Sequence, residues 1–179
     1  MSKETIPVRY HPFHVTLHWL IAVLVILMLA VGKLAMPGIP ADNPQKVMML
    51  QTHAYIGGAI ALLLTVRLIM RFTMKRPAPA DAGNAFLNFL AKAVHFLLYL
   101  LLIGMALSGL GLFQIANLPS VFSGAAPYPG DFFQYLPRMG HGLTSWLLLA
   151  LIALHVGAAM YHQFIRRDNL LGRMWFGKR

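Results

Sequence analysis

The segment from His141 to Phe164 constrains the fold of this chain most strongly, because it is apolar almost throughout and still carries three histidines. A helix turns about 100° and rises about 1.5 Å per residue, so His141, His155 and His162 return to nearly the same face. His141 and His155 then lie ~21 Å apart along the axis, which is most of a ~30 Å hydrocarbon core. The segment is therefore predicted to span a membrane, with imidazoles near both of its sides.

The composition of the whole chain indicates a membrane protein. Of its 179 residues, 58% are hydrophobic and only 11% are charged, and the mean hydropathy is +0.64. A soluble domain carries about a quarter charged residues. We expect an all-α fold, a four-helix transmembrane bundle forming a single membrane-embedded domain over residues 1–179, with spans near 15–35, 48–72, 90–115 and 141–164. The absence of cysteine excludes disulfides, iron–sulfur clusters and thiolate-ligated haem.

The distribution of Lys and Arg predicts the orientation of the bundle. Four spans place both termini on one side, and that side carries Lys3, Arg9, Arg71, Lys75, Arg76, Lys92, Arg166, Arg167, Arg173, Lys178 and Arg179. The other side carries only Lys33, Lys46 and Arg138. The positive-inside rule therefore predicts cytoplasmic N- and C-termini. The net charge of +10 is then a signal for topology and for anionic lipid, and we expect no nucleic-acid partner.

This topology sorts the histidines by depth. His53 and His141 are the two that lie deep enough on the outer side to pair there. On the inner side His155 has three possible partners, which are His14, His18 and His95.

Paired imidazoles from facing helices favour a particular cofactor. With no carboxylate or thiol nearby, two imidazoles suit bis-histidine haem iron better than a tetrahedral zinc site, and a helix bundle is a common place for haem. The alternative is that these histidines are ordinary polar residues between packed helices. Ionisable residues inside membranes are costly and usually functional, which favours the cofactor.

The same residues carry a family resemblance over nearly the whole chain. The marks are His18-Trp19, His53 followed by Arg67-Leu68 and Arg71, His95 with Tyr99, the histidines of the last span, Asp168-Asn169, Leu170-Leu171 and Arg173-Met174. With these marks the sequence resembles the bacterial cytochrome b561 family. No motif of the family is found in the loop 116–138, which should shape the outer donor site.

The resemblance implies two b haems, an outer one held by His53 and His141 and an inner one held by His18 and His155. It implies an inner-membrane oxidoreductase for electron transport, which oxidises superoxide to dioxygen at the periplasmic side and reduces ubiquinone. Members of the family use different donors and acceptors. The alternative is therefore a haem-bearing relay subunit for a partner dehydrogenase or a periplasmic redox protein.

Further polar residues are candidates for roles in this reaction. Lys46 and Arg138 fall near the outer ligand faces and are candidates to steer superoxide, with interfacial snorkelling as the alternative. Arg67 is a candidate partner for a haem propionate, or else it reaches lipid phosphate. His95 and His162 are candidates for a quinone site, because a quinone takes up protons when it is reduced, and the alternative for each is a structural hydrogen bond.

Overall fold

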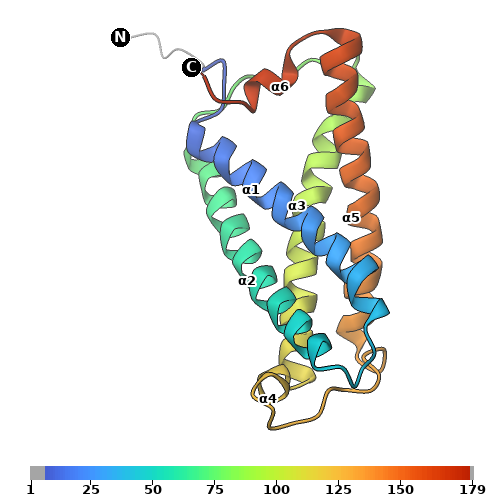
Figure 1. Ribbon diagram of the computed structural model, residues 1–179. Coiled ribbons are helices and arrows are strands. Elements are labelled where there is room, and N and C mark those ends of the chain that lie inside the picture. Colours follow the sequence, from blue (N-terminus) through green and yellow to red (C-terminus); the bar gives the residue numbers. More distant parts are fainter. Residues whose placement is uncertain (1–6, 178–179) are drawn as a thin grey trace.

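Four long helices form an elongated bundle in the computed structural model, which describes residues 7–177 (Figure 1). They are α1 (Pro12–Ala30), α2 (Pro44–Thr73), α3 (Ala85–Ile115) and α5 (Leu136–Met160); short helices α4 (Leu118–Phe122) and α6 (Leu170–Arg173) lie at opposite ends. A π-helical turn, Val31–Ala35, and a 3-10 turn, Met36–Gly38, extend α1, and a π-helical turn, Tyr161–Arg166, extends α5. The expected all-α class is confirmed. The cations Lys3, Lys178 and Arg179 lie outside the described residues.

The helices begin earlier than the apolar runs that predicted them. The side chain of Asn43 accepts a hydrogen bond from the Gln45 backbone N–H at the start of α2, and Asn84 does the same for Leu87 at the start of α3. Such caps satisfy N–H groups that lack a partner in the first turn. With their extensions the four helices contain 27 to 31 residues. At 1.5 Å per residue they reach about 40–47 Å, so their ends extend beyond a ~30 Å hydrocarbon core.

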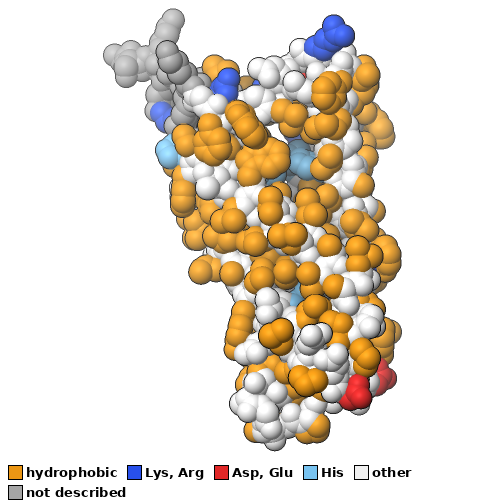
Figure 2. All heavy atoms as spheres, viewed as in Figure 1, with side chains coloured by type: hydrophobic (Ala, Val, Ile, Leu, Met, Phe, Trp, Pro, Cys, Tyr) orange, Lys and Arg blue, Asp and Glu red, His pale blue; other side chains and the backbone are white. Residues whose placement is uncertain are grey.

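The middle of the bundle is filled by aliphatic side chains, which we call the apolar layer. Its buried centre consists of Ile21, Val25 and Leu29 from α1 with Leu148 from α5, and partly buried side chains of α2 and α3 pack around it. Helix α1 runs obliquely across the bundle (Figure 1). In Figure 2, histidine side chains are visible at two heights of the molecule, with hydrophobic side chains in between. The apolar layer therefore separates two polar levels.

Residues 167–177, which we call the C-terminal strap, tie one end of the bundle together. The indole N–H of Trp19 donates to the Met174 carbonyl at 2.8 Å, and the Tyr10 backbone N–H donates to the Arg173 carbonyl at 3.1 Å. The Arg173 guanidinium donates to the Ala78 carbonyl at 2.9 Å, in the loop between α2 and α3. Both ends of the described chain therefore meet at the α6 end of the bundle, as an even number of spans requires.

Candidate functional site

Two histidine pairs lie between the helices, one on each side of the apolar layer. We call the α4 end of the bundle the outer end and the α6 end the inner end. The outer pair joins α2 to α5, with the ring centroids of His53 and His141 6.2 Å apart and inclined at 66°. The inner pair joins α1 to α5, with the ring centroids of His18 and His155 6.3 Å apart and inclined at 78°. The structure thus brings together the pairs expected from the family resemblance.

These separations fit two imidazoles on opposite sides of one metal ion. A metal–nitrogen bond of about 2 Å on each side places the two ring centroids about 6 Å apart. The ring of His95 is also close to His155, but its centroid lies 5.1 Å away, which is too short for the same arrangement. The geometry therefore favours His18 over His95 as the partner of His155.

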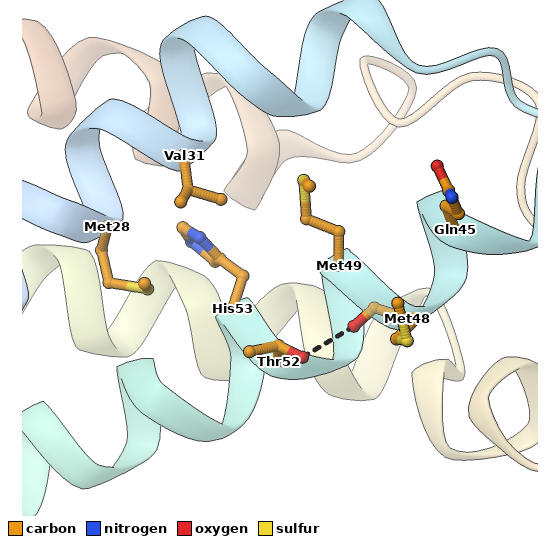
Figure 3. Close-up of a pocket in the computed structure, with 7 residues that line it drawn as sticks. All are labelled: Met28, Val31, Gln45, Met48, Met49, Thr52 and His53. Atoms are coloured by element: carbon orange, nitrogen blue, oxygen red, sulfur yellow. Dashed lines mark hydrogen bonds between the residues drawn. The ribbon is translucent and has the colours of Figure 1, made fainter.

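Space beside the outer pair suits a flat, largely apolar group. A cavity of about 320 Å³ opens between α1 and α2, and His53 points into it among apolar side chains (Figure 3). It is lined by Met28, Val31, Gln45, Met48, Met49, Thr52 and His53. The Nδ1 atom of His53 is buried without a hydrogen-bond partner. At Gly57, one turn beyond His53, a Cβ atom would meet nothing within 4 Å. The imidazole donors fit a b haem, and the cavity leaves apolar space next to His53.

Glycines bring helix backbones close to the outer rings. A Cβ atom at Gly32 would lie 3.6 Å from Cε1 of His53, and one at Gly109 would lie 3.6 Å from Cε1 of His141. The sequence analysis did not identify Gly32, which has no neighbouring motif. It also did not identify Ser108, whose hydroxyl lies 3.0 Å from Nδ1 of His141. The only signal for Ser108 was a polar residue near the outer end of an apolar span.

The outer cations occupy different environments. The Lys46 ammonium donates to the carbonyls of Met36 and Ile39, the latter at 2.8 Å, and so fixes the turn between α1 and α2. The Arg138 guanidinium lies 4.8 Å from the centre of the Phe133 ring. Its Nη1 atom lies 3.0 Å from where a Cβ of Gly142 would be, directly beside the outer pair. Arg138 is therefore the better placed of the two predicted steering residues.

A further outer cation, Lys33, has a specific partner. Its ammonium lies 3.7 Å from the centre of the Trp146 ring, which is 62% exposed. This is a close cation–π contact between the end of α1 and α5.

At the inner end, Arg67 connects three helices. Its Nε donates to the Tyr99 hydroxyl at 3.1 Å, and its Nη1 donates to the His14 carbonyl at 2.9 Å. The Arg71 guanidinium lies 5.4 Å from the centre of the Tyr99 ring. Arg67 therefore points into the bundle, on the inner side of the apolar layer.

The two predicted quinone-site histidines differ in burial. His95 is exposed, and its Nδ1 lies 2.6 Å from the Ala91 carbonyl one turn earlier in α3. His162 is buried, and its Nδ1 lies 2.5 Å from a carboxylate oxygen of Asp168. Burial acts to raise the pKa of Asp168, but the hydrogen bond and charge of His162, with Arg166 3.5 Å away, lower it below its usual value.

A four-helix membrane bundle that holds two imidazole pairs on either side of an apolar layer has the architecture of a membrane electron-transfer cytochrome. The sequence matches the family described as prokaryotic cytochrome b561 over residues 9–177, and the chain belongs to this family. The family implies b-type haem and electron transfer in a bacterial membrane.

Three relatives cover almost the whole chain. Cytochrome b561 homolog 1 of Escherichia coli (strain K12) is 26% identical, with 93% of this chain and 96% of the relative aligned. Cytochrome b561 homolog 2 of the same organism is 28% identical, over 97% of this chain and 95% of the relative. A protein named probable superoxide oxidase CybB from Yersinia pestis is 26% identical, over 96% of this chain and 98% of the relative.

Proposed function

We propose that this protein is a di-haem cytochrome b561 of the bacterial inner membrane that oxidises superoxide at the periplasmic side and reduces ubiquinone, with both termini in the cytoplasm. The observation that carries the proposal is the presence of two imidazole pairs, 6.2 and 6.3 Å between ring centroids, on opposite sides of the apolar layer. The name of the Yersinia pestis relative supports superoxide as the donor. The reaction balances when two superoxide anions give two dioxygen molecules and two electrons, and a quinone takes two electrons and two protons.

In this proposal His53 and His141 hold the outer haem, and His18 and His155 hold the inner haem. A b haem supplies a one-electron carrier at each level. Because each haem would be held by two histidines, neither dioxygen nor superoxide would bind the metal. The donor and the acceptor must therefore react without binding to it.

At the outer end, cations concentrate an anionic donor. Arg138 and Lys33 contribute positive charge next to α5, and Arg138 is packed against Gly142, the residue after His141. Local positive charge can raise the association rate of an anion about tenfold or more. Lys46 also contributes positive charge, although its ammonium is held by two backbone carbonyls.

At the inner end, His162 supplies protons to the quinone. Asp168 accepts a hydrogen bond from its Nδ1, which orients the ring and leaves Nε2 as the atom that would contact a quinone oxygen. His95 is exposed beside His155 and is a second candidate contact for the quinone. Arg67 is the candidate partner of an inner propionate, because it brings a positive charge to the bundle interior.

Stopped-flow mixing with superoxide tests the proposal. We expect the haem absorbance of the purified protein to become reduced by superoxide and to be reoxidised when ubiquinone is added. Arg138→Gln should slow the reduction more than Lys46→Gln, which is the matched control because it also removes one outer cation. His162→Ala should leave reduction unchanged and slow reoxidation.

The opposite results point to other functions. If superoxide does not reduce the protein and a dehydrogenase or periplasmic redox protein does, the chain is a relay subunit. If reoxidation by quinone is unchanged in both His95→Ala and His162→Ala, the quinone binds elsewhere.

A further inference from the structure

Ser108 of α3 makes a hydrogen bond with one of the outer histidines. Its Oγ lies 3.0 Å from Nδ1 of His141, which belongs to the neighbouring helix α5. It also lies 2.7 Å from the Gly104 carbonyl and 3.1 Å from the Met105 carbonyl of its own helix. The hydroxyl therefore has three polar neighbours within hydrogen-bonding distance.

The two carbonyls decide the direction of this bond. A serine hydroxyl has one proton, and a carbonyl oxygen can only accept, so the proton is directed at the backbone of α3. The Oγ then faces His141 with a lone pair and accepts from Nδ1–H. In a neutral imidazole this places the proton on Nδ1 and leaves the lone pair on Nε2, which is the atom a metal requires.

Two further features of α3 hold the ring in this orientation. The Met105 carbonyl accepts from the Ser108 hydroxyl at 3.1 Å, which keeps the Oγ lone pair on the His141 side. At Gly109 a Cβ would come within 3.6 Å of Cε1 and 3.8 Å of Nδ1, so glycine lets the ring lie close to the helix backbone. In contrast, Nδ1 of His53 across the site is buried without a partner. The outer pair is therefore asymmetric, with one ring anchored and oriented by α3.

From this geometry we infer that Ser108 is the positioning residue of the outer haem, which fixes the tautomer of His141 and lowers the reduction potential of the iron that His141 holds. The inference rests on the proposed outer haem. An Nδ1–H donated to an acceptor makes the imidazole a more basic ligand, and a more basic ligand favours the ferric over the ferrous state. Loss of such partners typically costs about 10- to 100-fold in metal affinity or activity.

An equilibrium redox titration of the purified holoprotein tests the inference. In Ser108→Ala both proposed ligands, His53 and His141, remain, so we expect the haem to stay bound. We expect the ferrous state of one haem to be favoured about tenfold more than in the wild-type protein. For a one-electron couple this is a rise of about 59 mV in the midpoint reduction potential of that haem. The midpoint of the other haem should not move. In the His18→Ala background, where the outer haem alone is expected, the same shift should persist.

Two variants separate positioning from a general packing effect. Ser108→Thr keeps a hydroxyl and should keep the wild-type midpoints. Ser145→Ala is the matched control, because Ser145 is also a serine inside the bundle whose hydroxyl bonds to its own helix, donating to the Gly142 carbonyl at 2.6 Å. It too should leave both midpoints unchanged.

Each outcome of the titration is decisive. If Ser108→Ala loses one haem and Ser108→Thr does not, the hydroxyl is needed to hold His141 in place, and the inference is supported in a stronger form than expected. Unchanged midpoints in Ser108→Ala, or an equal shift in Ser145→Ala, overturn it while the proposed function stands. A wild-type protein with fewer than two haems overturns the proposed outer haem, and the inference with it.

Discussion

The sharpest prediction concerns which histidine pairs with His155 at the inner end. Two rings compete for this position, that of His18 at 6.3 Å and that of His95 at 5.1 Å between centroids. Two metal–nitrogen bonds of about 2 Å require about 6 Å between the centroids, so His95 would have to move away by about 1 Å to take the place of His18. His95 is also held by its bond to the Ala91 carbonyl, which opposes such a movement.

The comparison of two single variants measures this difference. We expect His18→Ala to lower the haem content from about two b haems per chain to about one, and His95→Ala to leave about two. The pyridine haemochrome assay, with protein quantified separately, gives this ratio. His53→Ala should also leave about one haem, which calibrates the loss of a single ligand. Loss of a haem from His95→Ala, with retention in His18→Ala, would refute the geometric argument.

Three further predictions concern the stability of the bundle, measured by thermal unfolding of the detergent-solubilised protein. The pKa of Asp168 is lowered, so its stabilising bond to His162 is present above the usual carboxyl pKa and is lost as the pH falls through the lowered value. Asp168→Asn should lower the free energy of unfolding by about 1 kcal/mol at neutral pH and leave it unchanged in strong acid. A loss of stability that does not depend on pH would contradict this. Arg67→Gln breaks two hydrogen bonds from a charged donor and should cost about 2–4 kcal/mol, whereas Tyr99→Phe should cost about 1; equal costs would show that Arg67 does not join the helices. Leu148 is 1% exposed, so Leu148→Ala opens a cavity and should lower the free energy of unfolding by about 2–5 kcal/mol without loss of haem. A loss below about 1 kcal/mol would mean that the apolar layer closes around the cavity.

Much of this architecture could be predicted from the sequence. Long apolar runs indicate the four helices, and the alternation of their direction is enough to sort the histidines by depth. The sequence alone could not choose between His14, His18 and His95, because the choice depends on an ångström-level difference in ring separation. The helix starts were predicted too late, since capping residues such as Asn84 lie outside the apolar pattern.

The environments of single polar residues were harder to predict. Lys46 falls near the ligand face of α2, but the fold of the preceding turn places two carbonyls at its ammonium. A serine in an apolar helix usually bonds only to its own backbone, and nothing in the sequence shows that Ser108 also faces a ring on another helix. Such contacts depend on how helices are rotated about their axes, which weakly amphipathic membrane helices do not encode in their periodicity.

The apolar layer has an electrical consequence. Its centre of Ile21, Val25, Leu29 and Leu148 is aliphatic, so these side chains offer no polar atom that could pass a proton or an ion. In the proposed reaction the donor lies on the periplasmic side and the acceptor on the cytoplasmic side, so the electron is the only charge that crosses the apolar layer. Moving negative charge toward a cytoplasm that is already negative costs about 2.3 kcal/mol per electron for each 100 mV of membrane potential. A large membrane potential should therefore slow turnover of the proposed reaction, and depolarisation of the membrane should make turnover faster.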